Sequence, residues 1–289
     1  GSEIYLNYSI SHFGGVRDAV TGARLSLLNW YGKNYKAARE YDLDKLVFDE
    51  ETYRFFLNPE RGIWYEGKLP DRHKVHYKTN KNGIQFDINL DFKDIEPGFT
   101  WGSGLFKMGE NDLAGMYTQI PSSKIEGFIA LDYDTVYVSG TATMTQIHQT
   151  NVGTRLFEKS FRYIKRTNNG YLGGYFLIPK DSKTEIVGYA YEKKNGSVIL
   201  KKPISIKYLE TKKYKEEKIS SRIEICYINT ACDIIEVTAI SEKITMLDEL
   251  GGLKKIFAKR FLGGDIIELR GSAMLNKNQP VYYSLTILD

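Results

Sequence analysis

The stretch GIQFDINLDF, residues 83–92, alternates apolar and polar side chains at nearly every step. Successive side chains of a β-strand point to opposite faces, so this period of two predicts a strand with one buried and one solvated face. The stretch follows Asn82 directly, and Asn-Gly is the strongest short signal for a β-hairpin because both residues tolerate positive φ. The stretch therefore predicts antiparallel β-structure at this point in the chain.

The same alternation recurs along most of the sequence. It is found at Thr135–Met144, Phe157–Arg166, Val187–Tyr191 and Ser197–Tyr208. Turn signals separate these segments: Asn168-Asn169-Gly170, Asn195-Gly196 and Lys277-Asn278. Many short strands with few helices indicate a β-sandwich or a β-barrel.

Two segments are candidates for helices. Asn34–Tyr41 is short, whereas Thr245–Leu262 has a capping residue, apolar side chains at helical spacing and a stop at Gly263-Gly264. The longer segment is basic and amphipathic. We expect it to close one end of a barrel, with a membrane-surface helix as the alternative.

Length and composition narrow the function classes. A chain of 289 residues exceeds the usual size of one core, so two domains are expected, here 1–140 and 141–289. The net charge of +4 is small, and the lysine runs are not gathered on one element, which argues against a nucleic-acid partner. There is no run of about eighteen apolar residues, so no membrane span is expected. The compartment stays open; a secreted or periplasmic location fits if a signal peptide was removed.

The familiar signatures of cofactor and metal chemistry are missing. The sequence has no GxGxxG, P-loop, GxSxG or HExxH motif. His73 and His76 lie three residues apart, but no cluster of ligands completes a site, so neither a metal nor a cofactor is expected. Cys226 and Cys232 could face each other across a hairpin turning near Asn229-Thr230; a disulfide and two buried thiols both remain open.

The middle of the chain resembles a known family. Pro121, Gly127, Ser139-Gly140-Thr141, Met144 and Gly153 follow the order of the motif of a two-domain lipocalin-like family. That family includes the carotenoid hydratases (hydroxyneurosporene synthases), the yeast oxidative-stress survival factor, the lipocalin-type Diels–Alderases and the tocopherol cyclases. Further segments resemble its later strands, namely Phe157–Tyr163, Tyr175-Phe176-Leu177, Gly188–Gly196, Glu268–Gly271 and Val281–Leu288. The resemblance implies an all-β fold of two consecutive lipocalin-like antiparallel barrels, with one or two short helices.

The chain departs from the family where catalysis would take place. In the hydratases an Asp-His pair is the natural acid–base candidate, and here Thr145 and Gln146 stand at those positions. Threonine and glutamine cannot shuttle a proton at neutral pH. His148 lies two residues beyond Gln146 on the same predicted face, with Glu158 as its nearest acidic partner, so these two are the candidate catalytic residues. The alternative is that His148 is a partly exposed or hydrogen-bonded structural histidine.

Other residues are candidates for ligand binding. Glu158, Ser160 and Arg162 share one face of a predicted strand, opposite Phe157, Phe161 and Tyr163, and a Glu158–Arg162 pair at a cavity mouth could orient a polar head group. That face could equally be the solvent face. The predicted ligand-binding residues are Trp101, Gln146, Arg162, Tyr175 and Tyr189.

These observations favour one function and leave two others open. We expect a protein that binds or carries an apolar, lipid-like or isoprenoid-like small molecule in a barrel or between domains. The first alternative is an enzyme, a hydratase, cyclase or isomerase, that acts on such a molecule by proton transfer. The second is a structural or interaction protein whose barrels are filled by their own side chains. The sequence does not determine the oligomeric state.

Overall fold

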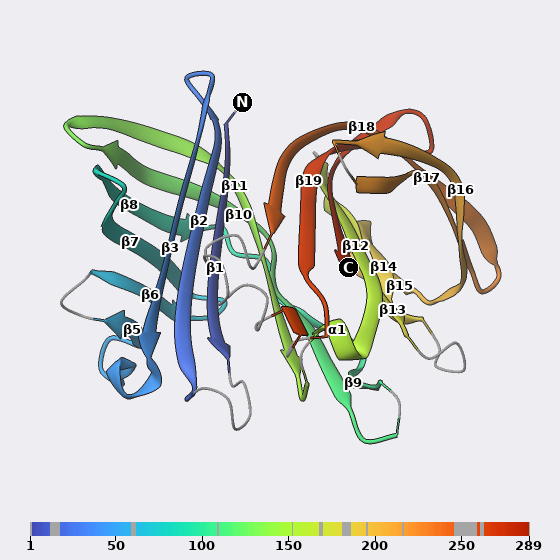
Figure 1. Ribbon diagram of the computed structural model, residues 1–289, viewed down its shortest axis with the longest axis horizontal. Coiled ribbons are helices and arrows are strands. Elements are labelled where there is room, and N and C mark those ends of the chain that lie inside the picture. Colours follow the sequence, from blue (N-terminus) through green and yellow to red (C-terminus); the bar gives the residue numbers. More distant parts are fainter. Residues whose placement is uncertain are drawn as a thin grey trace. The chain divides into compact units, whose positions relative to one another are not determined.

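The structure is a computed structural model. It describes residues 2–11, 18–58, 62–108, 110–151, 153–167, 170–180, 186–194, 196–215, 217–245, 259–260 and 263–288. Antiparallel strands dominate, as predicted, and Figure 1 shows them as two groups of curled sheets. The chain divides into two compact units, with unit 1 formed by Gly1–Phe99 and Thr118–Thr145 and unit 2 by Thr100–Tyr117 and Gln146–Asp289. The sequence boundary at 140/141 falls inside one long strand, β11.

Unit 1 contains a three-stranded sheet. Its strands are β1 (Glu3–Ser11), β2 (Val20–Trp30) and β3 (Lys33–Asp42), joined in that order. The segment 34–41, expected to be a short helix, is therefore a strand, and that prediction was wrong. A tight turn at Tyr31 and Gly32, both at positive φ, folds β3 back onto β2, so cross-strand pairing overrides the weak helical preference of the segment.

The second sheet is larger, and most of it belongs to unit 1, whereas β9 after Phe99, the first part of β10 and the end of β11 belong to unit 2. Its order is β11-β10-β8-β7-β6-β5-β4, and β9 pairs with β10. A one-turn 3-10 helix, Leu43–Lys45, leads into it. The strands are β4 (Val47–Asp49), β5 (Arg54–Asn58), β6 (Ile63–Lys68), β7 (Arg72–Lys81), β8 (Ile84–Lys93), β9 (Phe99–Lys107), β10 (Leu113–Leu131) and β11 (Asp134–Gln149).

The predicted alternation of residues 83–92 sets the core of unit 1. Phe86, Ile88 and Leu90 are buried, whereas the polar residues between them are not. They pack with residues of both sheets, including Leu25 and Tyr77. Each such side chain contributes about 1.5–3 kcal/mol when fully buried. The Asn82-Gly83 turn has both residues at positive φ, as a two-residue hairpin requires.

Unit 2 is built on one nine-stranded sheet. Its order is β15-β14-β13-β12-β20-β19-β18-β17-β16. A one-turn helix, α1 (Gly153–Leu156), leads into it. The strands are β12 (Phe157–Thr167), β13 (Gly170–Pro179), β14 (Val187–Lys194), β15 (Ser197–Lys201), β16 (Pro203–Tyr214), β17 (Glu217–Tyr227), β18 (Thr230–Thr245), β19 (Ile266–Leu275) and β20 (Gln279–Leu288).

This sheet closes on itself through one kinked strand. The two ends of its order, β15 and β16, are consecutive in the chain, with only Lys202 between them. The predicted strand 197–208 is thus broken before Pro203, and its first part pairs with β14 while its second part pairs with β17. Figure 1 shows the resulting curl. The enclosed core is aromatic and aliphatic and includes Phe161, Phe176 and Tyr283.

The remaining sequence predictions have mixed outcomes. Cys226 and Cys232 form a disulfide across the β17–β18 hairpin, which turns at Ile228-Asn229 next to the predicted position. The helix expected at Thr245–Leu262 lies largely outside the described residues, and Thr245 itself ends β18. Within the part of the chain that the structure describes, no helix has the length and apolar character needed to cross a membrane.

Candidate functional site

A row of side chains crosses six strands of unit 2 on the sheet face opposite its hydrophobic core. Each member faces the next directly in the register. From β18 to β14 the row is Glu242, Arg270, Ser284, Arg162, Tyr175 and Tyr189. Their sequence neighbours, such as Phe161 and Tyr283, point into the core, so the strict alternation of strands gathers these polar groups on one face.

One end of this row is a buried ion cluster centred on Arg270. Its Nε and Nη2 each lie 2.9 Å from an oxygen of Glu268, two residues earlier on β19, and its Nη1 lies 3.2 Å from Oε2 of Glu242. Ser284 donates a further hydrogen bond of 2.9 Å to Glu268. Burial alone would raise the pKa of Glu268, but the charge and hydrogen bonds of Arg270, with help from Arg162 and Ser284, lower it overall.

Arg162 lies next to this cluster, but its polar contacts differ from those of Arg270. Within the described ranges, no hydrogen bond or ion pair engages its guanidinium group, although the side chain lies deep in the unit and keeps only part of its surface exposed. Burial opposes its charge, yet the attraction of Tyr282, Glu268 and Tyr175 outweighs that effect and raises the pKa above its usual value. Arg162 is therefore a positive group with donors available to an acceptor from outside the described chain.

Aromatic rings border Arg162 on its other side. The ring of Trp101, on β9, lies 6.1 Å from that of Tyr175 and 5.7 Å from that of Tyr191, both at edge-on angles. Tyr191 lies over Gly173, where a Cβ atom would come within 2.4 Å of its hydroxyl oxygen. The absence of a side chain at Gly173 thus lets Tyr191 reach toward the guanidinium.

The absence of a side chain at Gly102 likewise leaves room for the Tyr189 hydroxyl. Gly102 has a φ of +56°, and a Cβ atom there would lie 2.6 Å from the Tyr189 hydroxyl oxygen. Phe106, further along β9, lies 6.3 Å from Tyr189, measured between ring centroids. Strand β9 therefore covers the tyrosine end of the row with aromatic side chains.

The structure brings four of the five predicted ligand-binding residues together. Trp101, Arg162, Tyr175 and Tyr189 all belong to this face of unit 2. Gln146, the fifth, is half-buried on β11.

The two predicted catalytic residues are both exposed. His148 lies near the end of β11 and Glu158 near the start of β12. No contact between them is present in the described part of the chain. A register shift between Phe157 and Lys159 displaces Glu158 from the regular pairing, and its charge acts on Tyr208 of β16. The carboxylate that acts on Arg162 is Glu268, so the predicted Glu158–Arg162 pair is not formed.

Sequence reasoning missed the acidic and basic partners on the far strands. These are Glu242, Glu268, Arg270 and Ser284. The alternation of Glu268, Leu269 and Arg270 is the one local signal that could have pointed to a strand with a charged face. The placement of this strand near Arg162 depends on the register between segments about a hundred residues apart, which the sequence pattern does not reveal.

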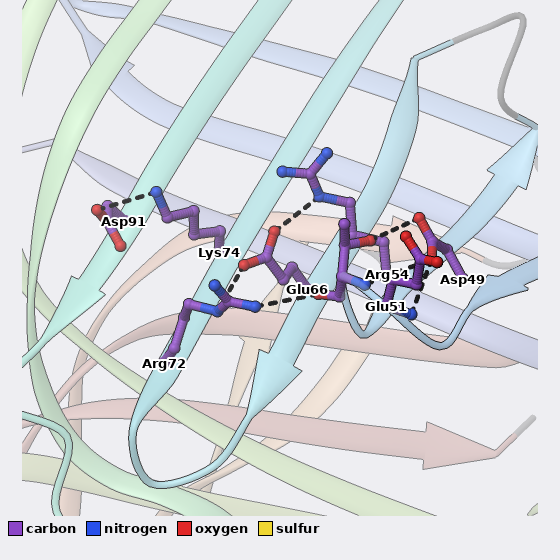
Figure 2. A network of polar contacts seen from close by, with 8 residues as sticks. Asp49, Glu51, Arg54, Glu66, Arg72, Lys74 and Asp91 are labelled. Carbon is purple, nitrogen blue, oxygen red and sulfur yellow. Dashed lines mark hydrogen bonds and ion pairs between the residues drawn. The ribbon is translucent and has the colours of Figure 1, made fainter.

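Unit 1 contains a second charged network, shown in Figure 2. Glu66 lies between Arg54 and Arg72, and each of its oxygens is 2.7 Å from the Nε atom of one of them. Lys74 and Asp91 form a neighbouring pair 3.4 Å apart. Since both oxygens of the buried Glu66 are already occupied by arginines, the network fits a structural role better than ligand binding.

Comparison with known proteins supports the fold and goes no further. No protein-family model matches the chain, and no curated protein matches its sequence. A solved structure, that of kievitone hydratase from Nectria haematococca, is similar over 99% of this chain and 87% of its own, with a TM-score of 0.55 and 10% identity. The fold is lipocalin-like. The predicted all-β lipocalin-like class is thereby confirmed, whereas an identity this low carries no activity across.

Proposed function

We propose that unit 2 binds an apolar small molecule whose polar head carries an oxygen acceptor, with Arg162 holding that head. The observation that supports this most is the state of Arg162, a guanidinium deep in the unit with no acceptor among the described residues. A partly buried cation without a hydrogen-bonding partner in the described chain has lost part of its hydration, and an incoming oxygen acceptor would replace it. A carboxylate could accept two parallel hydrogen bonds from it.

The aromatic border supports an apolar body for the same ligand. Trp101, Tyr175 and Tyr191 offer rigid rings with few rotatable bonds, so little side-chain entropy is lost when a ligand packs against them. Burial of apolar ligand surface would stabilise the complex by about 25 cal/mol per Å² before ordering costs are subtracted. In this arrangement the rings supply affinity and Arg162 supplies orientation.

Fluorescent fatty acids test this proposal directly. We expect cis-parinaric acid to bind the intact protein, and Arg162→Met to weaken that binding by about 10- to 100-fold, since hydrogen bonds to a charged group contribute about 1.5–3 kcal/mol. Fluorescence titration gives the dissociation constants. Arg222→Met, at a partly exposed arginine of unit 2 that pairs with Glu210 and Glu236, is the matched control and should bind normally.

The methyl ester of parinaric acid sharpens the test. It keeps the apolar chain but lacks the negative charge, so the intact protein should prefer the acid. In Arg162→Met the acid and the ester should bind alike. A preference for the acid that survives the substitution would contradict the role given to Arg162.

A second candidate function is proton transfer to a bound unsaturated molecule, with Tyr175 as the acid. Burial raises the pKa of the Tyr175 phenol more than Arg162 and a hydrogen bond with Ser160 lower it, so the phenol stays protonated at neutral pH and is available as a hydrogen-bond donor. The similar structure is itself a hydratase by name. Mass spectrometry of recovered ligand tests this: a gain of one water that Tyr175→Phe abolishes favours the enzyme, and unchanged ligand favours carriage.

A further inference from the structure

The kinked strand of unit 2 presents apolar side chains to solvent. Val198, Ile199 and Leu200 on β15 are 37%, 49% and 36% exposed, and Ile204 on β16 is 60% exposed. Three consecutive residues of a strand point alternately to its two faces, so both faces of β15 are open. Ile228, 52% exposed, joins them because its N–H donates to the carbonyl oxygen of Lys202 at the kink. These five residues are called the kink surface below.

The same segment holds an unusual share of the positive charge. Residues 193–207, on both sides of the kink, contain five lysines and no acidic residue, whereas the whole chain carries a formal charge of only +4. Lys193 pairs directly with Val198 in the β14–β15 register, and Lys201 and Lys202 occupy the kink itself. These three lysines therefore neighbour the apolar residues of the kink surface in the sequence and in the register, and Lys201 also lies 3.9 Å from Glu192.

We propose that the kink surface docks unit 2 onto an anionic lipid membrane. Exposed apolar side chains can enter the interfacial layer of a bilayer while lysines beside them contact acidic head groups. A nucleic acid would satisfy the lysines but would offer no counterpart to aliphatic side chains on both faces of a strand. The combination of charge and exposed aliphatic groups is what selects a lipid surface.

The kink surface also lies close to the aromatic residues that border Arg162. Leu200 faces Tyr191 directly in the β14–β15 register, and Tyr191 contacts Trp101. The docking surface thus begins one strand away from the aromatic border of Arg162. This proximity would let a lipid-soluble ligand pass between membrane and protein, but docking does not depend on ligand binding.

Vesicle co-sedimentation tests the proposal. The intact protein should sediment with vesicles of phosphatidylcholine and phosphatidylglycerol, and much less with phosphatidylcholine alone. Lys194→Gln combined with Lys202→Gln should lower the vesicle affinity by about 25-fold, at roughly fivefold for each lysine near an anionic surface. The exposed pair Lys33→Gln and Lys36→Gln in unit 1 is the matched control and should have no effect.

The apolar contribution is tested separately. Ile199→Ser combined with Ile204→Ser should also lower vesicle affinity by at least tenfold, whereas Leu105→Ser with Leu113→Ser, two exposed leucines of unit 2, should not. Circular dichroism confirms that each variant folds. The proposal is overturned if the intact protein does not bind acidic vesicles. It is also overturned if only the lysine variant loses affinity, because that result is expected of a general polyanion site. Self-association that the isoleucine variant abolishes would also contradict it.

Discussion

Replacing Arg270 by methionine is expected to lower the free energy of unfolding by about 3–5 kcal/mol. The substitution keeps most of the side-chain volume but leaves Glu242 and Glu268 without their shared cation, and Glu242 is almost fully buried. Removing one partner of a buried ion pair costs more than the pair itself contributes, because the remaining charge loses its compensation. Denaturant unfolding measures the loss, and hydrogen exchange of peptides from β19 and β20 assigns it to unit 2.

The control for this prediction is Arg222→Met. Arg222 also lies near two carboxylates, Glu210 and Glu236, at 3.3 and 3.2 Å, but its side chain is 35% exposed. Loss of such a solvated pair should cost no more than about 1 kcal/mol. Adding Glu242→Gln to Arg270→Met should restore part of the stability because it removes one buried charge. Equal losses of unfolding free energy in Arg270→Met and Arg222→Met would contradict the burial of the Arg270 cluster.

Acid is expected to destabilise unit 1 through His73. This side chain is 2% exposed, packs edge-on against Phe92 and sits near Tyr65. Burial outweighs the opposing effect of Glu66 and lowers the pKa of His73 to about 4. Between pH 6.5 and 4 the imidazole of His73 is therefore protonated in the unfolded chain but not in the folded unit. The free energy of unfolding should fall across that window by about 3 kcal/mol.

His73→Phe isolates this effect. Phenylalanine cannot take up a proton, so the acid-dependent part of the loss should disappear even if the absolute stability changes. His148→Gln, at an exposed position of unit 2, controls for the removal of a histidine. Hydrogen exchange of β7 peptides at several pH values is the measurement. A profile for His73→Phe as steep as that of the intact protein would contradict the assignment.

The sequence pattern predicted the fold class because alternation and turn residues act locally. The Asn82-Gly83 turn and the alternation of residues 84–92 lie where they were expected. The segment 34–41 was misjudged because pairing with β2, a tertiary effect, decides its conformation. The break of strand 197–208 at Lys202 is likewise set by closure of the sheet rather than by its own alternation.

Only some residues of the candidate site could be predicted from the sequence. Trp101, Arg162, Tyr175 and Tyr189 could be chosen by residue type and shared face, and they do lie together. The acid whose charge acts on Arg162, Glu268, could not be chosen, because a bulge near Glu158 and the register of β12 with β20 and of β20 with β19 decide which carboxylate is near. Local alternation fixes the face of a residue, whereas its neighbours across strands depend on register.

The most direct test of ligand binding at the Arg162 face uses the three tryptophans of the chain. Trp101 is buried beside Tyr175 and Tyr191 in unit 2, whereas Trp30 and Trp64 belong to unit 1. Each indole N–H gives one signal in a ¹⁵N-resolved NMR spectrum. Titration with cis-parinaric acid should shift the Trp101 signal and leave the other two in place. Shifts confined to Trp30 and Trp64, or no shift in a sample that binds the probe, would contradict the site proposed here.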